Sequence, residues 1–296
     1  MSVPAAAVDP GVAALLGRVW PALPPAIERA GALGFHWTAV STPFVRREAG
    51  RAVAHVGVIE QPLIVAGERR RVGFIHGVCT DPAHRRRGHA HALMEAALAH
   101  CRGRSATQVL TTQIPDFYAA FGFRPVREHA FSRPVPAGRR APGRGGQALS
   151  DGPDDVRRLH RLLESRRPVS ERLATCEDGT VFVFALLLTW GELSRARYHA
   201  ELDVITVHAV HGRTLVLYDV VGAAIPPLDA LVAAIGDDVD RVVTLFVPDR
   251  LGDGFTAEPW DAARAAALGD HDFVDVMVRG PLDVPEPFML PALART

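Results

Sequence analysis

The residues with the clearest capacity for chemistry lie between Val78 and Met94, where the sequence reads VCTDPAHRRRGHAHALM. The segment begins as an apolar strand, turns at Asp81-Pro82 and passes through a basic loop directly into a helix. Free backbone N–H groups and the positive end of the helix dipole favour an anion at such a helix start. The pattern therefore predicts a phosphate-binding loop.

Charge and backbone freedom support this prediction. The side chains of Arg85–Arg87 surround the helix start, and Gly88 lets the backbone approach a ligand without a Cβ in the way. The alternative is a solvated basic turn, because basic helix starts are common. The motif Arg85-x-x-Gly88-x-Ala90 lies between a predicted strand and a predicted helix, and this context favours the anion site.

A second candidate is the aromatic segment Ile114–Phe123, which reads IPDFYAAFGF. Tyr118 could donate a proton to a leaving thiolate, because phenol and thiol pKa values lie within a couple of units of each other. The alternative is that the phenylalanines form core and that Tyr118 is their amphipathic neighbour. Composition alone favours this second interpretation.

Taken together, the strand–RxxGxA–helix arrangement and the later FYxxFGF segment resemble the GNAT acetyltransferase superfamily over residues 36–131. Two positions depart from the family pattern: His89 stands where a glycine is frequent, and Asp81 precedes the usual proline. The run AHVGVIEQPLIVAGERRRVGFIHGV also looks like the Eis-like branch. That branch pairs an active domain with a second, degenerate GNAT-like half, which would suit residues 151–296.

The resemblance implies an N-acetyltransferase that uses acetyl-CoA as cosubstrate and no metal. Tyr118 would protonate the departing CoA thiolate, and the acceptor amine would attack the thioester directly, without an acyl-enzyme. The alternative is a GNAT scaffold that binds CoA or a partner without turnover. The strand and loop residues implied in cofactor binding are Val78, Cys79, Thr80, Arg85, Arg86, Arg87, Gly88, His89 and Ala90.

A general base would have to take a proton from an ammonium acceptor. His76 lies in the predicted central strand with the side-chain parity of Val78 and Thr80, and Glu60 lies at the end of the neighbouring strand. Either could act directly or through water. The alternatives are a hydrogen-bonded strand histidine and a turn carboxylate, so the identity of the base stays open. Cys79 has the opposite parity, and a buried strand cysteine is usually inert.

Other chemistries find little support. His84, His89, His91 and His100 do not predict a metal site, because residues two apart on a helix, such as His89 and His91, do not face each other. No GxSxG, GxGxxG or GxxxxGK[ST] motif occurs. Their absence argues against a hydrolase nucleophile elbow, a Rossmann dinucleotide site and a P-loop.

The elements expected to position these residues form a mixed α/β layer. β-branched and aromatic runs predict an antiparallel meander, and apolar residues at helical spacing predict the helices. The expected helices are 12–32, interrupted by prolines, 89–101 and 116–121. The expected strands are Trp37–Val45, Ala52–Val58, Leu63–Val65, Val72–Thr80, Gln108–Thr112, Phe123–Val126 and His129–Phe131.

A Pro/Gly-rich stretch, Arg133–Ser150, has the composition of a linker. We therefore expect an acyl-CoA-binding domain at 1–133, a linker at 134–150 and a degenerate GNAT-like α/β domain at 151–296. In the second part, Val181–Thr189 could be a buried helix or a strand. Elements expected there are a helix from Pro153, a hairpin of Leu202–Val210 and Thr214–Val221 turning at His211-Gly212, a helix Pro227–Ile235, and strands Arg241–Val247 and Val274–Val278.

The second half lacks a basic glycine loop after its hairpin. Ala223–Pro227 occupies that place, and Pro226-Pro227 removes two backbone donors. We therefore expect one active site per chain. Glu201, Asp203, Asp219 and Asp229 could line a cleft for a cationic acceptor, although solvated surface charges are the simpler interpretation.

Composition limits the classes of partner. Lys plus Arg equals Asp plus Glu, at 33 each in 296 residues, so no global field draws the chain to nucleic acid or membrane. Three scattered cysteines and no recognisable signal peptide favour a reducing cytoplasm. We expect a cytoplasmic protein with a small-molecule or peptide amine as acceptor and homo-oligomer formation possible. Nucleic-acid binding through Arg69–Arg71 and Arg85–Arg87 is a weaker alternative.

Overall fold

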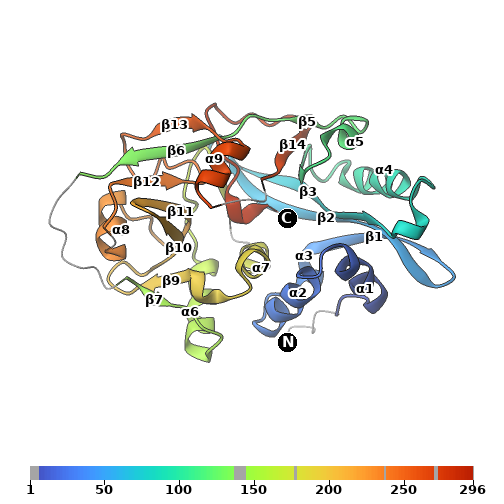
Figure 1. Cartoon of the computed structure of the whole chain (residues 1–296), viewed down its shortest axis with the longest axis horizontal. Helices are drawn as coiled ribbons and strands as arrows, with labels where there is room; N and C mark the ends of the chain where they lie inside the picture. Colours follow the sequence, from blue (N-terminus) through green and yellow to red (C-terminus); the bar gives the residue numbers. More distant parts are fainter. Residues whose placement is uncertain (1–6, 137–144, 177–178, 237, 270–272, 296) are drawn as a thin grey trace.

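The computed structural model of the chain describes residues 7–136, 145–176, 179–236, 238–269 and 273–295. Two seven-stranded mixed sheets lie side by side, which confirms the expected α/β class (Figure 1). The first sheet contains β1 (Ser41–Glu48), β2 (Arg51–Val65), β3 (Glu68–Thr80), β4 (Thr107–Thr112), β14 (Asp275–Arg279) and β5 (Arg124–Pro125) in this order, with β8 (Leu173–Thr175) paired to β2. The second contains, in order, β13 (Thr256–Pro259), β6 (His129–Pro134), β12 (Arg241–Thr244), β11 (Thr214–Val221), β10 (Val204–His211), β9 (Ala196–His199) and β7 (Gln147–Ala148).

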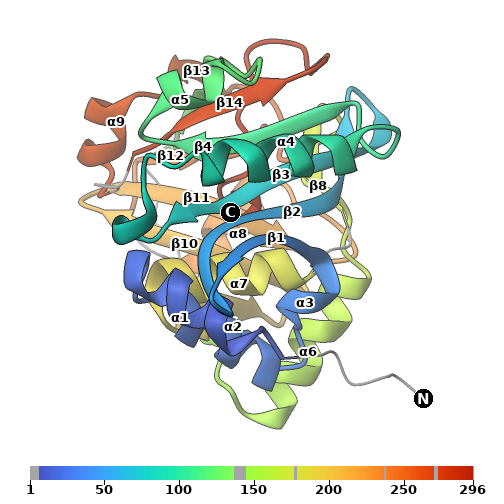
Figure 2. The same cartoon turned by 90° about the vertical axis from the view of Figure 1, so that its right-hand side faces the viewer.

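Helices cover both faces of the first sheet (Figure 2). One face packs against α4 (His89–Cys101) and α5 (Pro115–Ala119), and the other against α1 (Pro10–Val19), α2 (Leu23–Ala32) and α3 (Trp37–Val40). The remaining helices are α6 (Pro153–Glu164), α7 (Gly179–Trp190), α8 (Leu228–Ile235) and α9 (Ala262–Ala267), with short 3₁₀ turns η1 (Pro82–His84), η2 (Leu193–Arg195) and η3 (Ala292–Ala294). No helix in the described part of the chain is both long and apolar enough to cross a bilayer.

The two sheets exchange strands across the expected linker. Strand β14, near the end of the chain, pairs with β4 in the first sheet, and β6 pairs with β12 and β13 in the second. Figure 1 shows the red β14 beside the green and blue elements, and the green β6 among the orange strands. Residues 137–144 of the expected linker lie outside the described residues. Each sheet therefore takes strands from both sides of 134–150.

Two local expectations are wrong for physical reasons. Trp37–Val40 is helical rather than extended, and this turns Trp37 inward against Phe184, with ring centroids 4.0 Å apart. The strands expected at 52–58 and 63–65 are one strand, β2. Pro62, which has no N–H to donate, lies opposite Arg71 of β3, and on its other side it falls between the last β1 pair at Ile59 and the first β8 pair at Leu63.

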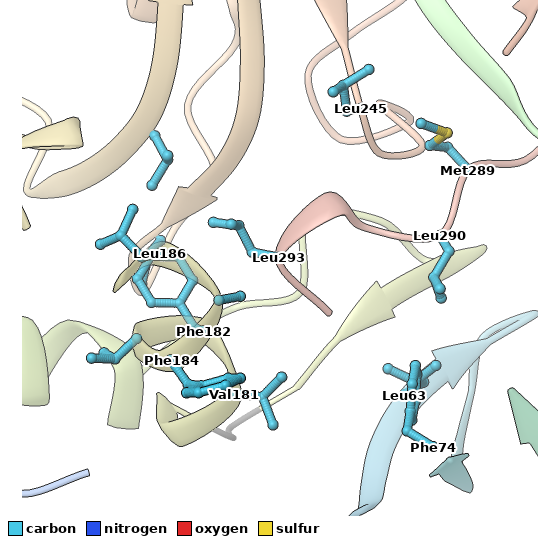
Figure 3. Close-up of a cluster of buried hydrophobic side chains, with 14 of the residues drawn as sticks. Leu63, Phe74, Val181, Phe182, Phe184, Leu186, Leu245, Met289, Leu290 and Leu293 are labelled. Atoms are coloured by element: carbon cyan, nitrogen blue, oxygen red, sulfur yellow. The ribbon is translucent and has the colours of Figure 1, made fainter. Parts of the chain in front are cut away.

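The helix α7 resolves an ambiguity that periodicity left open. It is apolar on all sides, and Val181–Leu187 are each at most 4% exposed. Such a helix is stable only where every face is covered. Figure 3 shows its Phe182 and Leu186 near Leu293 of η3. The helix thus fills the core between the two sheets.

The hairpin of β10 and β11 turns one residue later than expected. His211 pairs with Thr214, so the two turn residues are Gly212 and Arg213, and Gly212 has a φ of +60°. The other expected elements are present with small shifts of their bounds, including α4, whose limits match the expected helix 89–101.

Candidate functional site

The candidate site begins where two parallel strands separate. β3 pairs with β4 only over Val72–Phe74 and Thr107–Val109. Beyond these residues β3 continues to Thr80, and no further pairing with β4 is recorded along this described stretch. A strand edge of this kind carries backbone N–H and C=O groups that a ligand can use. The separation therefore leaves an unpaired edge of β3 that an extended, amide-containing molecule could pair with.

A β-bulge lies immediately beyond the point of separation. His76 pairs with Gly57 and Cys79 pairs with His55, so Gly77 and Val78 together face the single residue Val56. Gly77 has a φ of +57°, which favours glycine. A bulge adds one residue to a strand and bends it. It also reverses the alternation of side chains along β3.

This reversal corrects the expected parity of His76. Val78 packs with Met94 and Leu98 on the α4 face of the sheet. His76 instead meets the edge of Trp37, with centroids 5.1 Å apart, on the opposite face. His76 and Val78 therefore do not share a side of the strand, because the extra residue at the bulge lies between them.

The basic loop is open to a ligand at the start of α4. Gly88 is the N-cap residue with a φ of +78°, and a Cβ placed on it would meet nothing within 4 Å. Arg86 has the left-handed φ of +62°, and Arg85–Arg87 are exposed. The first N–H groups of α4 have no partner within the helix. The loop thus combines open space, free donors and positive charge, as expected for a phosphate site.

Asp81 fixes this loop, a role that sequence reasoning missed. Its Oδ1 accepts a hydrogen bond from the Ala83 N–H at 3.0 Å, and its Oδ2 accepts from Arg18 and Arg51 at 2.9 Å each. The Ala83 N–H, followed by these arginines, lowers the pKa of Asp81 although partial burial opposes it. The Asp-Pro pair was the available sequence signal, because aspartate before proline caps a turn.

Glu48, at the end of β1, is a second missed residue beside the loop. Its carboxylate lies 3.1 Å from His89 Nε2, 3.4 Å from an Arg87 nitrogen and 3.5 Å from His84 Nε2. His89, which stands where a glycine is frequent in the resembled family, therefore points its ring at Glu48. This contact explains how a bulky residue fits at the helix start.

Tyr118 lies in α5 on the same face of the sheet as Val78. It is 6% exposed and belongs to one apolar cluster with Met94 and Val78. Phe117 and Phe123 pack edge-on against it; Phe123 is buried in the core, whereas Phe117 is only partly buried. Burial raises the pKa of Tyr118 to about 12, so the phenol stays protonated at neutral pH.

Cys79 is buried on the other face, beside Leu15 and Leu16 of α1. Burial raises the pKa of its thiol to about 12. The thiolate is the nucleophilic form of cysteine. Cys79 is therefore present as an unreactive thiol at neutral pH.

The two predicted bases lie on opposite faces of the sheet. His76 is 7% exposed, its Nε2 lies 2.9 Å from Ser41 Oγ, and burial lowers its pKa to about 3. Glu60 faces α4 and contacts Arg71 at 3.0 Å and His100 Nε2 at 3.1 Å. A cavity of about 330 Å³ surrounds it, lined by Ala39, Val40, Thr42, Glu60, Arg71, His100 and Arg104. Basic side chains outnumber the single carboxylate there, which does not favour a cationic acceptor.

The acidic residues of the second half are engaged in ion pairs. Asp219 binds buried Arg166 through both oxygens at 2.6 and 2.8 Å. Asp203 pairs with Arg161, and Asp229 with Arg133. These three carboxylates therefore do not converge on a common cleft.

Comparison with known proteins finds a match to a protein family over the part of the chain that contains these residues. A family model described as "Acetyltransferase (GNAT) domain" matches residues 20–126. The fold is similar to that of a probable N-acyltransferase from Enterococcus faecalis V583, with a TM-score of 0.53 and 15% identity over 92% of this chain and 70% of that one. A GCN5-related N-acetyltransferase from Kribbella flavida gives a TM-score of 0.51 and 17% identity, over 92% and 68%.

A weaker similarity, with a TM-score of 0.47 and 15% identity, is to Eis1 from Mycobacterium abscessus, over 87% of this chain and 71% of that one. No curated protein matches the sequence.

Proposed function

We propose that the chain, whose residues 20–126 match a GNAT acetyltransferase domain, transfers an acetyl group from acetyl-CoA to an amine. The observation that carries the proposal is the juxtaposition along β3. The strand leaves β4, bulges at Gly77, passes Tyr118 on one face and ends at the loop before Gly88. An unpaired strand edge, the proposed proton donor and the proposed phosphate loop thus follow one another along one strand.

The residues present fit the acyl-CoA. The edge of β3 at Val78 and Thr80 would pair with the amides of the pantetheine arm. The loop from Arg85 to Ala90 would hold the pyrophosphate, because its helix start offers N–H groups and the space over Gly88 is open. Arginine side chains suit phosphate oxygens, since their charge-assisted hydrogen bonds are stronger than neutral ones.

In the proposed reaction, the amine nitrogen attacks the thioester carbonyl, so a C–N bond forms and the C–S bond breaks. The sulfur leaves as a thiolate that receives a hydrogen bond and then a proton from Tyr118. Because its pKa of about 12 exceeds that of a thiol, Tyr118 stays protonated until the thiolate forms. The amine loses its proton to a general base, directly or through water, and Tyr118 regains one from solvent. The high pKa of the Cys79 thiol supports direct transfer over an acyl-cysteine.

The general base stays a hypothesis divided between His76 and Glu60. His76 is neutral above about pH 3 and is too weak a base to deprotonate an ammonium directly. Glu60 would have to act through water, because Arg71 and His100 contact its oxygens. We propose a small-molecule or peptide amine as acceptor, in keeping with a cytoplasmic enzyme.

Release of free thiol from acetyl-CoA with a panel of amines tests the activity. We expect Tyr118→Phe to lower kcat about a hundredfold, as for loss of a general acid, with little change in the Kd of CoA. The matched control is Tyr198→Phe in the second sheet, which removes a hydroxyl bonded to Asp203 at 2.9 Å and should leave kcat unchanged.

Two outcomes would contradict the proposal. Tight binding of CoA with no thiol release from any amine would instead support a non-catalytic scaffold. Full activity of Tyr118→Phe would remove Tyr118 from the mechanism and leave the activity itself standing.

A further inference from the structure

Two histidines on neighbouring strands each cover the glycine opposite. The ring of His55 in β2 lies over Gly77 in β3, where an added Cβ would lie 3.1 Å from Nδ1. The ring of His76 in β3 lies over Gly57 in β2, where an added Cβ would lie 2.2 Å from Nε2. Both residues are buried, at 3% and 7% exposure, and their ring centroids are 6.1 Å apart. The two pairs form a reciprocal histidine–glycine arrangement across the β2–β3 ladder.

The bulge lies between these two pairs. In a regular antiparallel ladder each inward carbonyl accepts a hydrogen bond from the neighbouring strand, but a bulge leaves its extra residue without that partner. Here the carbonyl oxygen of Gly77 lies 2.8 Å from His55 Nδ1. A carbonyl can only accept, so Nδ1 carries the proton and His55 is the donor. The side chain of His55 thus replaces the ladder bond that the bulge removes.

The bulge determines which side chains and backbone groups β3 presents at its unpaired edge. Pairing of β3 with β4 ends at Phe74, shortly before Gly77. Without the extra residue, every side chain after the bulge would change faces, because the side-chain period of a strand is two. Val78 would then leave the α4 face, where it packs with Tyr118, and the backbone edge offered to a ligand would turn with it.

We propose that His55 is a positioning residue for the acyl-CoA. The Nδ1–H of His55 holds Gly77 in the bulge, and the bulge sets the orientation of the unpaired edge of β3 along which the acyl-CoA would bind. His76 holds the other end of the bulge through Ser41 Oγ at 2.9 Å and its contact with Gly57. His55 touches neither reactant, so its effect on the reaction passes through Gly77. This inference rests on the proposed acetyltransferase function.

The test compares His55→Leu with His55→Asn. Leucine fills much of the ring's volume but donates no hydrogen bond, whereas the asparagine amide can place a donor near the position of Nδ1. We expect His55→Leu to raise the Kd of CoA and the KM of acetyl-CoA about tenfold with a smaller change in kcat, and His55→Asn to stay within about threefold of the parent. Equal CoA affinity in all three proteins, or equal losses in both variants, would overturn the proposal.

A second measurement does not depend on any activity. Long-range ¹H–¹⁵N NMR correlations of the unliganded parent protein should show His55 as the neutral Nδ1–H tautomer. An Nε2–H tautomer would overturn the bond to Gly77 even if the enzyme is active or if His55→Leu does not fold. Absence of acetyl transfer by a parent protein with the Nδ1–H tautomer would instead overturn the proposed function and leave the bulge contact intact.

Discussion

The two sheets contain the same strand–loop–helix–strand unit, but the two helix starts differ in the backbone donors that they leave free. In each, a strand leads through a loop and a helix to a parallel neighbour: β3, α4 and β4 in the first sheet, and β11, α8 and β12 in the second. The first helix starts at exposed Gly88 after three arginines. The second starts after Pro226-Pro227, and the N–H of Leu228 already binds the carbonyl of Leu251 at 2.9 Å. An anion would find free donors at the first helix and few at the second.

The strand edges also differ between the two units: the end of β3 is unpaired toward β4, and the end of β11 is covered. β11 and β12 pair over only four residues each, Thr214–Leu217 and Arg241–Thr244, so β11 also outruns its neighbour. The end of β11 is nevertheless buried, because η3 lies against it and the Ala292 N–H binds the carbonyl of Leu245 at 3.2 Å. Figure 3 shows Leu293 of η3 directed toward Phe182 and Leu186 of α7. The chain's own segment η3 thus covers the end of β11, whereas the end of β3 stays unpaired toward β4.

The largest expected effect is on stability and comes from η3, which covers the end of β11. Leu293 is 4% exposed, so Leu293→Ala should lower the free energy of unfolding by about 3 kcal/mol through lost burial and an unfilled cavity. Thermal unfolding should show a melting temperature several degrees lower, with the Kd of CoA unchanged. The control is Ile114→Ala, since Ile114 is 62% exposed. A loss of stability below about 1 kcal/mol would show that η3 is not firmly packed over the end of β11.

The next effect is on CoA binding and concerns the loop before α4. Gly88→Val should weaken CoA binding at least tenfold, or about 1.4 kcal/mol, because the valine side chain occupies the space above the helix start. Calorimetric titration with CoA measures this change. Gly212→Val in the β10–β11 turn is the matched control, since Gly212 also has a positive φ and open space around a Cβ. If both variants bind CoA equally well, the loop does not hold the phosphates.

The smallest effect is a pH dependence specific to the first loop. The pKa of Asp81 is lowered in the folded protein, so its contribution to stability is complete above its unfolded pKa of 3.8 and is lost as the pH falls through the lower folded value. The stability difference between the parent and Asp81→Asn should therefore be constant from about pH 5 to 8 and shrink below about pH 4. Denaturant titrations across this range measure it. Asp229→Asn, which removes an exposed partner of Arg133, is the matched control for loss of one surface carboxylate.

Local patterns predicted the parts of the site that lie close together in the sequence. The limits of α4 and the loop before Gly88 follow from helical spacing, charge and a glycine, all within one short segment. The aromatic packing of Tyr118 follows from its neighbours in the same way. Each of these features depends on residues a few positions apart, which is the range that periodicity and turn chemistry describe.

Features that depend on distant partners were not predictable. The bulge at Gly77 requires His55 from another strand, and without it the parity of His76 was wrong. The roles of Asp81 and Glu48 depend on Arg18 and on a histidine of the loop, which only the folded chain brings near. Trp37 became helical because α7, far along the chain, offered Phe184 as a packing partner. Tertiary contacts override local propensity in each case.

The exchanged strand β14 has a consequence for synthesis of the protein. β4 receives its second neighbour only from residues 275–279, so the first sheet cannot be completed until these residues have left the ribosome. Until then, one edge of Thr107–Thr112 is unpaired, and such an edge is a site for aggregation or for chaperone binding. A nascent chain that stops before residue 275 therefore contains the loop before Gly88 but not the finished sheet that holds β4 in place, so the first sheet is completed only late in its synthesis.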